Sequence, residues 1–87
     1  MNIQVRLNGH LSVLAGRSRA QITVDETERD GRVTVADVLA ELSTQYPQTA
    51  ASIKSAVSVI GGRHVPHDTI VSAGQEVAVL VPIAGGG

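Results

Sequence analysis

The 87-residue sequence contains no cysteine, no phenylalanine and no tryptophan, and Tyr46 is its one aromatic residue. Without cysteine the chain forms no disulfide, has no thiolate nucleophile and offers no cysteine ligand to a metal. A hydrophobic core must therefore be built from Val, Ile, Leu and Ala side chains, with little contribution from aromatic packing.

The sequence also lacks an excess of positive charge, with seven Lys or Arg residues against eight Asp or Glu and a formal net charge of -1. Such a chain has few cations to neutralise phosphates and no aromatic platform for stacking bases, so we expect no nucleic-acid partner. No apolar stretch approaches the roughly 20 residues of a membrane span, and residues 1–6 alternate in polarity, unlike a signal peptide. We therefore expect a cytoplasmic protein with no membrane partner.

Hydrophobic residues make up 43% of the chain and charged residues 17%, which is typical of a folded globule. A chain this short has room for one hydrophobic core. We assign residues 1–82 to a single domain and residues 83–87 to a tail.

Two strands are predicted near the start of the chain. Ile3, Val5 and Leu7 alternate with polar residues, which is the period of a strand with one buried face. Residues 20–24 alternate in the same way, and a long connection would join the two strands into a hairpin. Residues 25–32 are six charged residues, one threonine and one glycine, with almost no apolar side chain, and indicate a solvated loop.

One main helix is predicted after this loop. Thr34 can cap its first turn, and Asp37 places an acid near the positive end of the helix dipole. Pro47 would end the helix, and residues 52–55 are expected to form a short second helical turn. The apolar stripe of the helix has the spacing of one helical face and consists of Val35, Val38, Leu39, Leu42 and Tyr46.

The second half of the chain predicts further strands. The apolar run 56–60 meets Gly61 and Gly62, a pair favoured in two-residue hairpin turns. The turn-forming residues 72–75 precede a last strand over 76–81. Two hairpins separated by a helix bury one core if the helix crosses one face of a mixed sheet. The expected fold is an α+β, ubiquitin-like β-grasp with four to five strands, in which the first and last strands pair in parallel.

The chain ends in three glycines that contribute nothing to a core. Pro82 lacks an N–H and should stop the final strand, so that Ile83, Ala84 and the glycines leave the sheet. Ordering such a tail costs about 1–2 kcal/mol per residue, most of all for glycine. From Pro82 to Gly87 an extended chain spans at most about 17 Å. The pattern favours an arm that enters the active site of a partner protein.

The candidate reactive group is the terminal carboxylate of Gly87. A carboxylate is ionised at neutral pH and is a poor acyl donor, so it needs activation before a sulfur or amine nucleophile can attack. Condensation with ATP to an acyl-adenylate would supply the leaving group. The alternative interpretation of the glycines is a frayed end or a cloning remnant.

The segment Gly74–Gly87, GQEVAVLVPIAGGG, carries a family resemblance. It resembles the sulfur-carrier branch of the ubiquitin-like proteins, above all the small subunit of molybdopterin synthase and more distantly the thiamine sulfur carrier. Two positions depart from the family pattern. Gly85 makes the ending a triple glycine, and Leu80 and Val81 stand where aromatic side chains are common.

The resemblance implies how the tail would work. An adenylyltransferase of the ubiquitin-activating type would use ATP to adenylate Gly87, and a sulfur donor would convert it to a thiocarboxylate. A larger synthase subunit, or another sulfur-accepting enzyme, would take the sulfur. The chain would then bind no cofactor itself and would act as a co-substrate or small subunit, with no catalysis of its own. The resemblance further implies that Leu80 and Val81 belong to the partner surface and that the tail residues bind in the partner's active site: Pro82, Ile83, Ala84, Gly85 and Gly86.

Several functions remain open from the sequence alone. The sulfur could go to molybdopterin, thiamine, cysteine or another sulfur amino acid, transfer RNA or a specialised metabolite. A protein modifier would instead join Gly87 to a lysine of a target, and a simple interaction module would use no tail chemistry. His64 and His67 have a ligand spacing, but Pro66 lies between them and no third ligand is near, so no metal site is expected.

Overall fold

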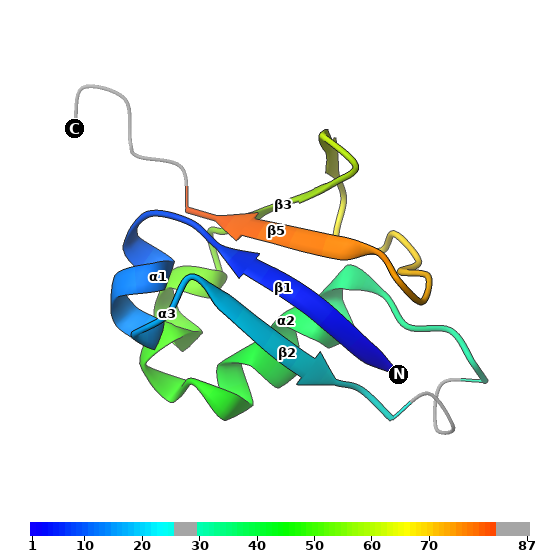
Figure 1. Ribbon diagram of the computed structural model, residues 1–87, viewed down its shortest axis with the longest axis horizontal. Helices are drawn as coiled ribbons and strands as arrows, with labels where there is room; N and C mark the ends of the chain where they lie inside the picture. Colours follow the sequence, from blue (N-terminus) through cyan, green and yellow to red (C-terminus); the bar gives the residue numbers. More distant parts are fainter. Residues whose placement is uncertain (26–29, 82–87) are drawn as a thin grey trace.

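The computed structural model describes residues 1–25 and 30–81, and these residues form a five-stranded mixed sheet with helices packed against it (Figure 1). The spatial order of the strands is β2-β1-β5-β3-β4. The strands are β1 (Asn2–Leu7), β2 (Arg19–Thr23), β3 (Val57–Ile60), β4 (Arg63–Val65) and β5 (Glu76–Leu80). The helices are α1 (His10–Ala15), α2 (Val35–Gln45), the 3-10 helix η2 (Pro47–Thr49) and α3 (Ala50–Ile53).

The strands from the two ends of the chain pair in parallel at the centre of the sheet. β1 lies beside β5, with Val5 opposite Val77 and Leu7 opposite Val79, while all other pairings are antiparallel. This parallel pair, flanked by two hairpins and crossed by α2, is the β-grasp that the sequence predicts.

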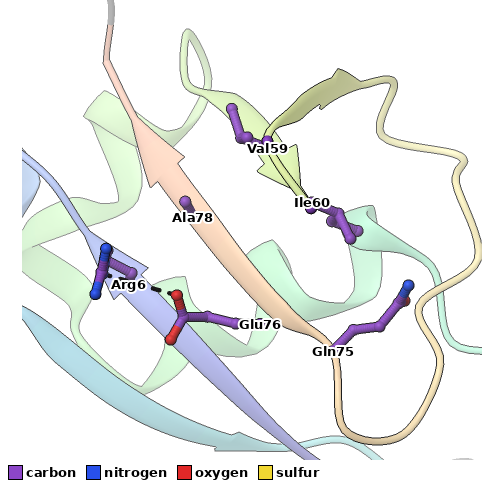
Figure 2. A pocket seen from close by; sticks show the side chains of 8 residues that line it. Arg6, Val59, Ile60, Gln75, Glu76 and Ala78 are labelled. Atoms are coloured by element: carbon purple, nitrogen blue, oxygen red, sulfur yellow. Dashed lines mark ion pairs between the residues drawn. The ribbon is translucent and has the colours of Figure 1, made fainter.

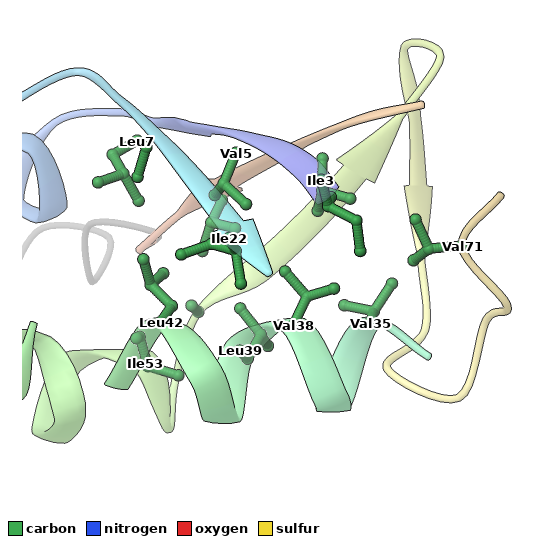
Figure 3. Close-up of a cluster of buried hydrophobic side chains, with 14 of the residues drawn as sticks. Ile3, Val5, Leu7, Ile22, Val35, Val38, Leu39, Leu42, Ile53 and Val71 are labelled. Carbon is green, nitrogen blue, oxygen red and sulfur yellow. The ribbon is translucent and has the colours of Figure 1, made fainter. Parts of the chain in front are cut away.

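The core lies between the sheet and α2 (Figure 3). In β1 the residues Ile3, Val5 and Leu7 are buried and the residues between them are exposed, as the alternation predicts. All four apolar positions of the predicted helix that precede Tyr46 are buried, and Tyr46 packs partly against them. The buried hydrophobic cluster of the described residues is therefore aliphatic, with Tyr46 packed at its edge.

The first turn of α2 is held by a reciprocal cap. The Asp37 N–H donates to Thr34 Oγ1 at 3.3 Å, and the Thr34 N–H donates to Asp37 Oδ2 at 2.9 Å. These bonds satisfy two of the donors that a helix start leaves unpaired. The helix ends at Gln45, and Pro47 begins η2 in place of a further turn.

One helix and several boundaries differ from the sequence prediction: the strand predicted over 20–24 spans 19–23, and the apolar run 56–60 forms a strand over 57–60. The connection between the first two strands is not irregular but contains α1, whose Leu11 is fully buried. The predicted helical turn at 52–55 lies at 50–53, and the last strand ends at Leu80 rather than at residue 81. Residues 26–29 of the predicted loop lie outside the described residues, whereas Asp30, Gly31 and Arg32 are exposed.

The turn between β3 and β4 has the geometry that its glycine pair predicts. Gly61 and Gly62 have φ angles of 59° and 78°. Two successive positive φ angles belong to a tight hairpin turn that matches the twist of its strands. Among the helices of the described residues, none combines the length and apolar character that crossing a membrane requires.

Candidate functional site

The central strand β5 positions the start of the predicted tail. Leu80 ends β5 opposite Val57 of β3 and is half-buried. Val81, the last described residue, packs partly against the core. The predicted tail residues Pro82, Ile83, Ala84, Gly85, Gly86 and Gly87 lie outside the described residues. The segment therefore starts from a strand that is hydrogen-bonded on both sides, β1 on one and β3 on the other.

The face of the sheet opposite α2 carries a shallow groove beside β5 (Figure 2). Because side chains alternate along a strand, burial of Val77 and Val79 against the helix turns Glu76, Ala78 and Leu80 to this open face. The groove is lined by Arg6, Val59, Ile60, Gly61, Gly62, Gln75, Glu76 and Ala78. Its floor is small and apolar, and its rim is polar.

A single ion pair crosses the end of this groove. Arg6 Nε lies 3.7 Å from Glu76 Oε1, and the two side chains are 45% and 47% exposed. An ion pair this exposed contributes little to stability because water and salt screen it. Its two charges are therefore accessible to solvent on this face.

The part of the chain that the structure describes presents no cluster suited to hold a metal. In residues 1–25 and 30–81, no group of three or more His, Asp or Glu side chains could hold a metal ion. His64 lies on β4 opposite Val59, and His67 follows the strand in the next loop. The groove and the predicted tail thus share the strand β5, the groove along its first half and the tail after its last residue.

The sequence prediction named residues at the end of β5 and did not name the residues that line the groove. Leu80 and Val81 were expected to form the partner surface, and Leu80 does lie on the open face, whereas Val81 also packs on the core. The groove beside them was not expected, since Arg6, Val59 and Glu76 come from three separate segments. The alternation of residues in β5 could have predicted part of this face, because it separates Ala78 and Leu80 from the buried valines.

The fold and the position of β5 define the class as a ubiquitin-like β-grasp protein. More specifically, the model of the ThiS family matches residues 5–86, and the chain belongs to this family. The match leaves out residues 1–4 and the last residue, Gly87.

Solved structures share this fold over nearly the whole chain. SAMP1 from Haloferax volcanii superposes with a TM-score of 0.82 at 22% identity, covering 98% of this chain and 99% of that one. The small archaeal modifier protein 1 from Methanosarcina acetivorans gives 0.77 at 20% identity, covering 97% and 95%. A complex of subunits 1 and 2 of the molybdopterin-converting factor from Helicobacter pylori gives 0.65 at 13% identity, covering 98% and 99%. A comparison with curated proteins found no match.

Proposed function

We propose that this chain is a sulfur carrier whose working group is the carboxylate of Gly87, most directly for the synthesis of molybdopterin. One observation carries the proposal. The segment Pro82–Gly87 follows directly from the central strand β5, in a chain that the ThiS family model matches up to Gly86. A strand hydrogen-bonded on both sides is a rigid base from which a thin arm can enter a partner.

The chemistry requires two steps on the terminal carboxylate. An adenylyltransferase of the ubiquitin-activating type condenses it with ATP, which releases pyrophosphate and leaves an acyl-adenylate. A donor that delivers sulfur at the oxidation level of sulfide then attacks the Gly87 carbonyl carbon, the C–O bond to AMP breaks, AMP leaves with the electron pair, and a thiocarboxylate remains. Neither step needs a catalytic side chain from the folded domain. The domain instead supplies the surface that the enzymes bind in order to position the tail.

The open sheet face is the proposed docking surface for the enzymes that use the tail. The groove lies along the first half of β5, so a partner that covers it and extends along the strand past Leu80 would reach the root of the tail. The molybdopterin-converting factor of Helicobacter pylori forms a complex of subunits 1 and 2, which supports a larger synthase subunit as the partner here.

A protein modifier is the second candidate, because two of the solved neighbours are named archaeal modifier proteins. In this case an amine of a target protein attacks the activated carbonyl and an isopeptide bond results. The two functions share the adenylation step and differ in the nucleophile that follows.

Intact mass spectrometry tests the carrier function. After incubation with ATP, a sulfur source and the activating enzyme, the protein should gain the mass that corresponds to the exchange of one oxygen for sulfur. Deletion of Gly86 and Gly87 should abolish this gain while the circular dichroism spectrum stays unchanged, because every strand ends before Pro82. Sulfur-dependent synthesis that survives the deletion would overturn the proposal. Conjugates of the protein with other chains, resistant to reducing agent, would favour the modifier.

A further inference from the structure

The strand β2 forms one edge of the sheet (Figure 1), and its outer side is unpaired. At the start of the strand the Leu7 N–H donates to the Ser18 carbonyl at 2.8 Å, and in an antiparallel ladder such bonded pairs recur at every second residue. Ala20 and Ile22 therefore turn their N–H and C=O groups to β1. The other residues of the strand turn these groups outward, where no described strand pairs with them: Arg19, Gln21 and Thr23.

This edge lacks the features that usually keep a sheet from pairing with another chain. β2 has five residues and contains no proline, glycine or lysine. Its register with β1 runs without a bulge from the pair Asn2–Thr23 to the pair Arg6–Arg19. By contrast, the other edge strand, β4, has three residues and is followed by Pro66. The edge of β2 is therefore the better position for the addition of a strand.

Opposite charges flank the two ends of this edge. Arg19 begins β2, Asp25 comes two residues after its end, and both residues are exposed. Within its own sheet Arg19 lies directly opposite Arg6, and like charges in such positions repel each other. Arg6 pairs with Glu76, whereas no carboxylate of the described residues pairs with Arg19. A second strand could supply the counter-charge that Arg19 lacks.

We propose that β2 pairs with β2 of a second copy of this chain, antiparallel and with Gln21 opposite its counterpart on the two-fold axis. In this register Arg19 lies opposite Thr23 of the second copy, so every outward N–H and C=O group of the edge finds a partner. Asp25 of the second copy becomes the diagonal neighbour of Arg19, at about 7–8 Å, which a long side chain can span. This contact does not depend on the activation of Gly87.

Such a dimer leaves the proposed docking faces open. The same edge of both copies forms the contact, and its two-fold axis runs perpendicular to the sheet. Both grooves beside β5 therefore lie on one side of the joined sheet, and both α2 helices lie on the other side. Because β5 of one copy runs antiparallel to β5 of the other, the two tails begin at opposite ends of the dimer.

Sedimentation equilibrium on the full chain tests this pairing without a partner enzyme. We expect a reversible monomer–dimer equilibrium that weakens at high salt, because the charge pairs are exposed. Arg19→Asp puts acids at both ends of the edge, and Asp25→Arg puts bases at both ends. Each variant alone should raise the dissociation constant of the dimer by about tenfold, since two attractive pairs become repulsive.

A mixture of these two variants is the critical sample. In the mixed dimer each acid of one copy faces a base of the other, so the dissociation constant should return close to that of the parent protein. The mixture contains the same two proteins as the separate samples, so recovery would exclude misfolding as the cause of the weakened association. Association that neither variant weakens, or that mixing does not restore, would overturn the proposed register.

A cysteine probe reports the contact directly, because the chain has no cysteine of its own. Residues of a hydrogen-bonded antiparallel pair have Cα atoms about 5.5 Å apart, which suits a disulfide. In air-oxidised buffer, Gln21→Cys should form linked dimers at least about tenfold faster than Gln4→Cys, since a paired thiol is already oriented. Gln4 is the matched control, because it is exposed and lies beside Gln21 on β1.

Two further results would contradict the pairing. Equal rates of disulfide formation in the two cysteine variants would show that Gln21 does not meet its counterpart. A chain that stays monomeric at millimolar concentration would show that the edge accepts no second copy. The thiocarboxylate on Gly87 is measured separately by intact mass, so this inference and the carrier function can fail independently.

Discussion

Two buried hydroxyl groups of this domain differ in one respect, their hydrogen bonding. Thr49 and Ser58 are both fully buried. Thr49 Oγ1 donates to the Tyr46 carbonyl at 2.7 Å, whereas Ser58 Oγ has no partner among the described residues. A buried hydroxyl without a partner has lost its hydrogen bonds to water and has gained none in return.

Replacing Ser58 by alanine should therefore raise the free energy of unfolding by about 1 kcal/mol, because the uncompensated hydroxyl is removed from the core. Urea denaturation measures this change as a shift of the midpoint at constant slope. The matched control is Thr49→Val, which removes a satisfied hydroxyl and should lower the free energy of unfolding by about 1 kcal/mol. A less stable Ser58→Ala variant would mean that the hydroxyl is bonded, for example to a buried water.

At the level of single elements, α2 was predictable and α1 was not. The sequence marks α2 by its apolar stripe and by the Thr34 and Asp37 cap, and both appear in the structure. By contrast, α1 has only six residues, begins after Gly9 and has no side-chain cap. A helix this short is unstable alone, and burial of Leu11 in the core stabilises it. Its helical state depends on tertiary packing, which cannot be predicted from the local sequence pattern.

The cap of α2 leads to a second stability prediction. Thr34→Ala removes the hydroxyl that accepts the Asp37 N–H and should lower the free energy of unfolding by about 1 kcal/mol. Thr34→Ser keeps the oxygen and should stay close to the parent protein. Thermal unfolding followed by circular dichroism measures both, and equal melting temperatures of the parent and Thr34→Ala would contradict the role of the cap.

The turn of the β3–β4 hairpin leads to a third stability prediction. Gly62 has a φ of 78°, and no atom would meet an added Cβ within 4 Å. The cost of Gly62→Ala is therefore one of backbone conformation alone, about 1–2 kcal/mol. Gly61→Asn should cost less, because asparagine tolerates the left-handed region and is common in this turn. The denaturant midpoint of Gly62→Ala should therefore be lower than that of Gly61→Asn. The reverse order would contradict the assigned turn geometry.

Across the whole molecule, the β-grasp topology was predictable and the docking face was not. Hairpin, helix and hairpin in one short chain leave few ways to bury a single core, so the central parallel pair follows from the pattern. The groove depends on which segments become neighbours, and Arg6, Val59 and Glu76 are far apart in the sequence. Residues 82–87 lie outside the described residues, so the chemistry proposed for them still rests on their composition and on the family.

A substitution on the open face should weaken binding to a partner without unfolding the domain. Val59→Glu places a charge in the apolar floor of the groove and should weaken binding to a synthase or activating partner by at least about tenfold, because a charge would be buried without a counter-ion. Gln21→Glu adds the same charge to the same face on β2, away from the groove, and should bind normally. Isothermal titration calorimetry compares the two, and equal affinities would exclude the groove as the docking surface.

The central place of β5 also matters during synthesis on the ribosome. The core cannot close until the last strand has left the exit tunnel, because β1 has no partner on one side before β5 arrives. A prematurely terminated chain lacks this strand and exposes an unpaired edge, which favours aggregation and degradation. The folded population is thereby restricted to chains that have been translated at least through β5, the strand directly before the glycine terminus.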